Sequence, residues 1–357
     1  MGSLVEEQTM QRRASVRSLA TLAAATLLVT SAVPALANGK RIGMASREIT
    51  NDYNRGIIAG AQKVIEASGD TMAVVDGGGD PRKHNENIEN LINAHVDGLI
   101  IQLGDAQQLA PEVAKAKAAG IPVVTTSVGA KTEGALTEVG GDEDLMATMM
   151  TRALLSSIGY QGDVYVVWVP GAPLLETRKR ILEAMIKDYP KVKLHEVPTE
   201  HSAAKVQSQM EDLLTANPDV GSITAVWGAY DLLTSGAVQA IRQAGRNEIK
   251  VASIDGDRVG FQMLLSDGSP FVATVAQDVP KIGELAGQTV EDAIKGKKEF
   301  PAFMFTDAFV ATRANGVAAA ERRWGPDVWK QINMDPKEIT GRLPQTEPVL
   351  VVHPVLP

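Results

Sequence analysis

The alternation of two kinds of segment is the feature of this chain that most restricts its fold. Between residues 41 and 311, short runs rich in Val, Ile and Leu are followed by amphipathic stretches of about 12 to 18 residues. This order is typical of parallel strands joined by crossover helices. The runs are almost continuously apolar, as expected for strands buried on both faces of a sheet. The sequence therefore predicts an α/β protein built from doubly wound parallel sheets.

The predicted strands are 41–46, 71–76, 98–103, 122–126, 136–140, 163–169, 192–198, 222–227, 249–254, 271–276 and 304–311. The predicted helices between them include 53–68, 81–94, 106–119 and 144–158. Gly120 and Gly245 stand where a helix passes into the next strand, as left-handed helix caps would. The tail is predicted to contain one short helix near Trp324. Beyond residue 335 it is rich in proline and is predicted to be irregular, apart from an extended piece at 349–352.

The first 37 residues have the organisation of an export signal. Three arginines within residues 12–17 precede an apolar run at 19–33, and the small-x-small triplet Ala35-Leu36-Ala37 follows. The run is shorter than the ~20 residues of a spanning helix, although an uncleaved membrane anchor is the alternative. We expect cleavage and release of the mature chain into the periplasm. Either Met1 or Met10 can serve as the start of translation.

Composition and motifs argue against several classes of function. The net charge of −8 is unlike that of proteins that bind nucleic acid, which need a basic face. The chain has no cysteine, and its five histidines lack the spacing of metal ligands, so no metal site is expected. Gly77-Gly78-Gly79 lacks the pattern of a phosphate-binding loop and is interpreted as a turn, so no cofactor is predicted. Ser127 lacks the full G-x-S-x-G pattern of a nucleophile elbow, and no catalytic residue is predicted.

Polar and aromatic side chains recur at the carboxyl ends of the predicted strands, the edge at which doubly wound sheets bind ligands. Any one of them could instead cap a helix or lie on the surface, but their recurrence at one edge favours a ligand site. The candidate ligand-binding residues are Arg47, Asn51, Tyr53, Gln102, Ser127, Arg178, His201, Tyr230, Asp255 and Gln277.

Several segments together resemble the periplasmic sugar-binding proteins of the ribose and galactose type, which share a fold with the effector domain of the lac repressor family. The segments are 60–62, 97–101, 119–124, 178–180, 213–220, 254–256 and 273–277. The resemblance implies the type I periplasmic binding protein fold, in which two lobes joined by three hinge crossings close around a ligand. It implies an N-terminal lobe of residues 39–141 plus 278–309. The C-terminal lobe would hold residues 142–277 plus 310–357.

The resemblance also implies a function without catalysis. Such a protein binds a small sugar, polyol or sugar derivative and delivers it, as a monomer, to the permease of an ABC importer in the inner membrane. Planar Arg, Asp, Asn and Gln groups can bond two neighbouring hydroxyl groups, and aromatic rings can cover the C–H surface of a sugar. By the resemblance, Asn51, Tyr53, Gln102, Arg178, Asp255 and Gln277 match ligand positions of the family, with Tyr230 in place of an Asn and His201 where an aromatic residue is common.

Two positions depart from the pattern of the ribose type. The strand that begins at Pro122 ends in Ser127-Val128 rather than in Asp-Arg, and residue 47 is Arg. A linear polyol, a deoxy sugar or an acidic sugar derivative therefore remains open beside a ring sugar. An alternative of another kind is a sensory binding protein that signals to a membrane histidine kinase. It would hold a small amine or oxide in a cage drawn from Tyr53, Trp168, Trp227 or Tyr230.

Overall fold

The computed structural model describes residues 39–354, so the predicted export signal lies outside the described residues. The strands are β1 (Arg41–Ser46), β2 (Thr71–Asp76), β3 (Gly98–Gln102), β4 (Val123–Thr126), β5 (Glu138–Gly141), β6 (Gly162–Trp168), β7 (Val192–Pro198), β8 (Ala225–Gly228), β9 (Lys250–Asp255), β10 (Phe271–Gln277), β11 (Phe303–Thr306), β12 (Ala308–Thr312) and β13 (Val351–Val352). The helices are α1 (Asp52–Ala67), α2 (Pro81–Asn93), α3 (Ala106–Ala118), α4 (Glu143–Ser157), α5 (Pro173–Ile186), α6 (Ala203–Ala216), α7 (Asp231–Gln243), α8 (Arg258–Leu265), α9 (Val279–Ile294), α10 (Gly316–Trp324), α11 (Val328–Gln331) and α12 (Pro336–Arg342).

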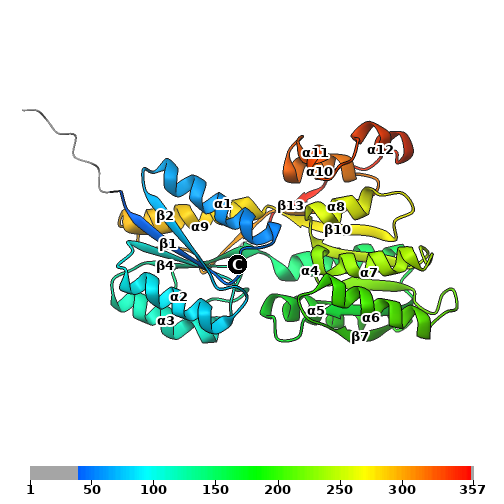
Figure 1. Cartoon of the computed structure of the whole chain (residues 1–357), viewed down its shortest axis with the longest axis horizontal. Coiled ribbons are helices and arrows are strands. Elements are labelled where there is room, and N and C mark those ends of the chain that lie inside the picture. Colours follow the sequence, from blue (N-terminus) through cyan, green and yellow to red (C-terminus); the bar gives the residue numbers. More distant parts are fainter. Residues whose placement is uncertain (1–38, 355–357) are drawn as a thin grey trace, which may run out of the picture. The chain divides into compact units, whose positions relative to one another are not determined.

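The first sheet has six parallel strands in the order β11-β5-β4-β3-β1-β2. Helices α1 and α9 lie on one side of it and α2 and α3 on the other (Figure 1). Small residues allow α1 and α9 to pack closely. A Cβ atom on Gly60 would lie 2.0 Å from the carbonyl oxygen of Pro280, and one on Gly283 would lie 1.9 Å from that of Ile57. Glycine is therefore required on both helices where they meet.

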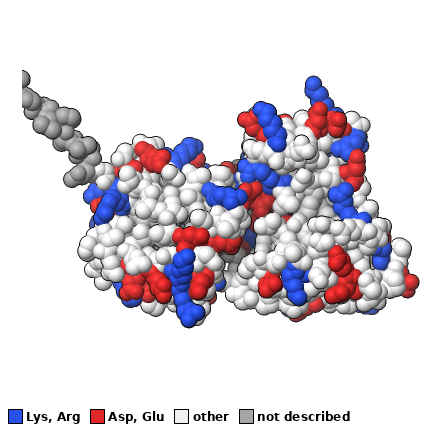
Figure 2. Space-filling view, in the orientation of Figure 1, with Lys and Arg blue, Asp and Glu red and all other residues white. Residues whose placement is uncertain are grey.

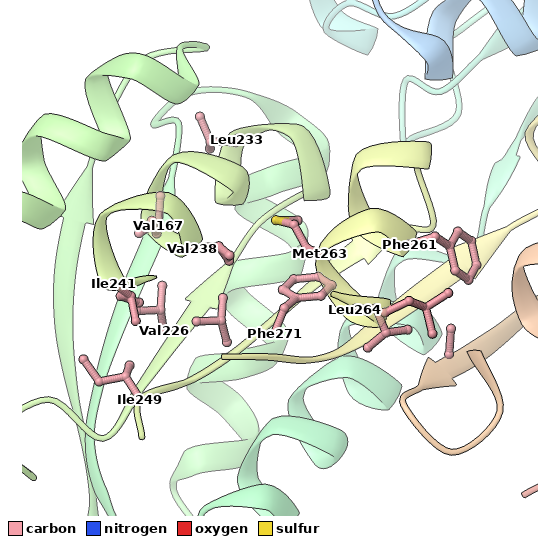
Figure 3. Packing of buried hydrophobic residues seen from close by; sticks show 14 of the residues in the cluster. Val167, Val226, Leu233, Val238, Ile241, Ile249, Phe261, Met263, Leu264 and Phe271 are labelled. Atoms are coloured by element: carbon pink, nitrogen blue, oxygen red, sulfur yellow. The ribbon is translucent and has the colours of Figure 1, made fainter. Parts of the chain in front are cut away.

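The second sheet has seven strands in the order β13-β12-β10-β9-β8-β6-β7, and its first two strands run antiparallel to their neighbours. Its largest apolar cluster joins β8, α7, α8 and β10 (Figure 3). Val226, Ile241, Leu264 and Phe271 are fully buried there. Burial of such side chains contributes about 1.5–3 kcal/mol each. This cluster packs α7 and α8 against β8 and β10 of the second sheet.

The chain passes between the two sheets three times, as the resemblance implied. The passages follow β5, follow β10 and separate β11 from β12. The predicted two-sheet α/β fold is confirmed. The lobe boundaries stay a prediction, although strand pairing places Ala308 and Phe309 in the second sheet, two residues earlier than the predicted division.

Two predictions about the C-terminal part are wrong. The predicted strand 304–311 is two strands in different sheets, because the backbone leaves β11 at Asp307 and enters β12 without an intervening turn. The segment after residue 335 is not irregular throughout, since Asp335 caps α12 and Pro336 begins it. Residues 313–354, which we call the C-terminal extension, contain α10, α11, α12 and the short strand β13.

The predicted turns have the expected backbone. Gly120 and Gly245 have φ values of +77° and +69°, so both adopt the left-handed conformation that glycine tolerates best. Gly78 and Gly79 also have positive φ and join β2 to α2. Within residues 39–354, no helix combines the length and apolar character needed to cross a membrane.

Candidate functional site

A buried ion-pair group occupies the carboxyl ends of β9 and β10. Arg178, on α5, is 2% exposed, and its Nε donates to Oε2 of Glu143 at 2.5 Å. Its Nη1 donates to the Ala229 carbonyl at 2.7 Å, and its Nη2 donates to Oδ1 of Asp255 at 3.2 Å. Nε2 of Gln277 donates to the same Oδ1 at 3.0 Å. We call Arg178, Glu143, Asp255 and Gln277 the charged cluster.

Burial and the facing charges shift the pKa values of the charged cluster in opposite directions. Burial alone would lower the pKa of Arg178, but the adjacent carboxylates of Glu143 and Asp255 raise it. Burial raises the pKa of both carboxyl groups, and the Arg178 charge opposes that rise. Two carboxylates facing one guanidinium leave an excess of acceptors. Oε1 of Gln277 is buried and has no hydrogen-bond partner within the described chain.

A second group of polar side chains lies at the carboxyl ends of β3 and β4 and at the start of α1. The Tyr53 hydroxyl is 2.7 Å from Oγ of Ser127, and Nε2 of Gln102 donates to Oδ1 of Asn54 at 3.2 Å. We call these four residues the neutral cluster. Burial and then the charges of Glu143 and Asp255 raise the pKa of Tyr53. Ser127 and Glu143 line the same cavity, so the neutral and charged clusters lie near one another.

The backbone of the neutral cluster is shaped by a buried carboxyl group. Ser127 has a φ of +57°, an uncommon conformation for a residue with a side chain. Oε1 of Glu138, on β5, accepts hydrogen bonds from the backbone N–H groups of Val128 at 2.7 Å and Gly129 at 3.1 Å. Burial raises the pKa of Glu138 to about 7. Glu138 thus holds the turn that directs Ser127 toward Tyr53.

The remaining predicted residues make separate contacts. Asn51 caps α1 by accepting from the Asn54 N–H at 2.8 Å, so its side-chain oxygen has a structural partner. Nδ1 of His201 is 2.9 Å from the Tyr230 hydroxyl, and Arg47 donates over a long 3.5 Å to the Gly79 carbonyl. These residues stay predictions as ligand contacts. Of the four aromatic residues considered for a cage, Trp227 is fully buried and its indole donates to Thr151, so it is not available to a ligand.

The sequence prediction missed Glu143, Asn54 and Glu138. Glu143 follows Asp142 in the first turn of α4, where acidic residues are common for helix stability alone. Asp231 also follows a predicted strand end but was not among the candidate ligand-binding residues, and its carboxylate accepts from the Asp257 N–H at 2.9 Å and from Thr274 Oγ1. Burial raises the pKa of Asp231 to about 7. It lies beneath the site and supports the loop after β9.

The surroundings of the site are mixed in charge. No group of His, Cys, Asp or Glu in residues 39–354 is arranged to hold a metal ion. Basic and acidic side chains alternate over the visible face, without a broad basic patch (Figure 2). A cavity of about 410 Å³ extends from the site along β5 and β11. It is lined by Ser127, Gly129, Glu138, Gly140, Gly141, Asp142, Glu143, Asp144, Leu174, Thr177, Arg180, Phe303 and Phe305.

A family model described as a periplasmic binding protein domain matches residues 42–298. The chain belongs to this family. It is 30% identical over 262 residues to the ribose import binding protein of Bacillus subtilis, a match that covers 72% of this chain and 82% of the relative. The two parallel-dominated sheets match type I periplasmic binding protein structures.

Two solved structures of the family are similar over most of the chain. One is a solute binding protein of an ABC transporter from Agrobacterium vitis with bound allitol. It is 28% identical, has a TM-score of 0.75, and the match covers 80% of this chain and 99% of that one. The other is the 5-methylthioribose transporter solute binding protein of Thermotoga lettingae. It is 26% identical with a TM-score of 0.72, and the match covers 85% of this chain and 98% of that one. These family members are binding proteins.

Proposed function

We propose that this protein binds a small, neutral sugar or polyol in the periplasm and delivers it to the permease of an ABC importer. The observation that carries the proposal is the charged cluster, in which Arg178, Asp255 and Gln277 meet at the carboxyl ends of neighbouring strands. Such side chains can bond adjacent hydroxyl groups. The family relationship to ribose and allitol binders supports the same class of ligand.

The ligand is neutral rather than acidic. The three donor nitrogens of Arg178 already donate to Glu143, Asp255 and the Ala229 carbonyl. A carboxylate of a sugar acid would face the two buried carboxylates of Glu143 and Asp255, and Arg178 would have no free edge with which to bind it. Hydroxyl groups suit the site better because each can donate to a free acceptor such as Oε1 of Gln277 and still accept a bond. An acidic sugar derivative, which the sequence left open, is therefore disfavoured.

The protein releases its ligand chemically unchanged and works as a monomer. The relatives named above are binding proteins, and this supports binding rather than catalysis. A ligand lacking one bonded hydroxyl leaves a buried partner unsatisfied, at about 1–3 kcal/mol. Selectivity would therefore follow from the number and position of the hydroxyl groups.

A thermal-shift screen followed by calorimetric titration tests the proposal. The panel contains pentoses, hexoses, alditols and matched sugar acids. We expect a neutral sugar or alditol to raise Tm and its acid analogue to have little effect, with mass spectrometry recovering the bound compound unaltered. Asp255→Asn should weaken binding at least tenfold, whereas the control Asp267→Asn, at a largely exposed carboxylate, should not. Preference for the acid, or conversion of the ligand, would contradict the proposal.

A further inference from the structure

A cavity of about 290 Å³ lies where the C-terminal extension meets two of the passages between the sheets. It is lined by Asp278, Asp307, Phe309, Arg322 and Arg323. Asp278 directly follows β10, and Asp307 separates β11 from β12, whereas both arginines belong to α10. The cavity therefore joins the extension to the sheet edge at which the charged cluster lies.

Arg323 is a buried cation with an unfilled bonding edge. Its side chain is 9% exposed, and neither Nε nor Nη2 has a hydrogen-bond partner in the described part of the chain. These two nitrogens form one side of the planar guanidinium, which can bond two oxygens side by side. A buried donor pair of this kind destabilises a fold unless another group satisfies it. The cavity gives such a group room.

The guanidinium edge is held in place by the extension itself. Cζ of Arg323 lies 4.0 Å from the centroid of a Trp324 ring, and this stacking restricts the plane of the guanidinium. The Trp324 indole donates to the Gly256 carbonyl at 2.9 Å, which ties it to the loop after β9. A preorganised bonding edge loses less conformational entropy on binding than a mobile one.

The charges around the cavity favour a neutral partner for Arg323. Asp278 caps α9, and Oδ1 of Asp307 is 2.7 Å from His353. The two arginines and two aspartates that line the cavity balance in formal charge. An anion therefore gains little net attraction, whereas hydroxyl groups can accept from the guanidinium and donate to a carboxylate. Asp257, which is 5% exposed and has one unpartnered oxygen among the described residues, is such an acceptor.

We infer that Arg323 bonds two adjacent hydroxyl oxygens of the ligand, so that the C-terminal extension forms part of the ligand site. Arg323 stacks on Trp324, whose indole donates to the carbonyl of Gly256, the residue after Asp255, and this supports its proximity to the charged cluster. The inference rests on the proposed function, because it requires a polyhydroxylated ligand. It adds a specificity-determining residue on a segment that lies beyond the matched family domain.

The variant Arg323→Met tests the inference in the full-length mature protein. Methionine keeps a long apolar side chain against Trp324 but removes the donors. We expect the affinity for the tightest-binding sugar or alditol of the screen to fall tenfold or more. The ligand-free Tm should stay unchanged or rise, because a buried unpaired charge is removed. The matched control Arg342→Met, which alters an arginine of α12 that pairs with Asp267, should leave affinity unchanged.

Deoxy analogues separate direct bonding from an indirect structural effect. In the wild type, removing either hydroxyl that Arg323 bonds should weaken binding, whereas in Arg323→Met the same removal should make no difference. Unchanged affinity, or an equal loss for every analogue in both proteins, would overturn the inference while leaving the proposed function intact. Failure of every sugar and alditol to bind the wild type would overturn the proposed function, and this inference with it.

Discussion

The two polar clusters of the site differ in how they are held. In the charged cluster, one guanidinium fixes two carboxylates that the core would otherwise not tolerate. In the neutral cluster, Tyr53 and Ser127 share a single hydrogen bond, and Gln102 donates over a longer distance to Asn54. Loss of one member should therefore disrupt the charged cluster and only loosen the neutral one. The comparison suggests that one side of the site sets affinity and the other adapts to the shape of the ligand.

The largest effect should come from removing the cation of the charged cluster. Arg178→Met leaves Glu143 and Asp255 buried without their shared partner, and we expect a loss of about 3–5 kcal/mol in the free energy of unfolding. Equilibrium urea unfolding at pH 8 measures it. The control is Arg180→Met, since Arg180 and Asp144 form an exposed pair worth about 0–1 kcal/mol. A loss for Arg178→Met no larger than that of the control would remove the proposed difference between the clusters.

The contribution of Glu138, which holds the turn of the neutral cluster, to the stability of the protein should depend on pH. Burial raises the pKa of Glu138 from the ordinary 4.5 to about 7. The folded protein therefore binds more protons than the unfolded chain between these values, and stability falls as the pH rises through this window. Burial acts on Asp231 in the same direction. The charge of Lys131 opposes the rise in the pKa of Glu138. The other charged residues that line the cavity beside Glu138 are Asp142, Glu143, Asp144 and Arg180.

Glu138→Gln keeps an oxygen for the Val128 and Gly129 N–H groups but cannot ionise. We expect the variant to gain about 2 kcal/mol relative to the wild type between pH 5 and pH 8. Urea unfolding curves at both values measure this difference. If the two proteins lose stability in parallel as the pH rises, Glu138 does not titrate in this range.

A smaller effect is expected from the hydroxyl of Tyr53. Tyr53→Phe removes its hydrogen bond with Ser127 and should destabilise the protein by about 1 kcal/mol, with a modest loss of ligand affinity. Calorimetric titration and urea unfolding provide the two values. A loss of affinity as large as that of Asp255→Asn would show that the neutral cluster contributes equally to binding.

The smallest expected effect concerns an ion pair between the two sheet systems. Arg258 Nη1 and Asp52 Oδ2, from α8 and α1, are 2.8 Å apart and partly exposed. Asp52→Asn should change the free energy of unfolding by about 0.5 kcal/mol, and 1 M salt should reduce the difference further. Thermal unfolding at low and high salt measures it. A loss of more than 2 kcal/mol would indicate that this pair matters as much as a buried one.

The sequence predicted regular elements well and polar partners poorly. β1, β2 and β7 have the predicted bounds. The passage at Asp307 was missed because the chain stays extended while it changes sheets, so no glycine, proline or change of period marks it.

The same limit applies to the site. Residues that end strands, such as Asp255 and Gln277, can be predicted because topology brings strand ends together. Glu143 makes the shortest hydrogen bond to Arg178, but the sequence could not predict this pair. The two residues lie 35 positions apart on different helices, and only the packing of these helices brings them together. Arg323 lies in the C-terminal extension, and no local sequence pattern indicates where this extension packs on the sheet.

The position of Trp324 gives the protein a built-in optical probe. The guanidinium carbons of Arg258 and Arg323 lie 3.9 Å and 4.0 Å from Trp324 ring centroids, and Arg258 in turn donates to Asp52 on α1. Any rearrangement that separates α1 from α8, or that redirects Arg323 toward a bound molecule, changes the electric field across this ring. Fluorescence emission from Trp324 would therefore report ligand binding without an added label. Replacing the other three tryptophans by phenylalanine would isolate the Trp324 signal.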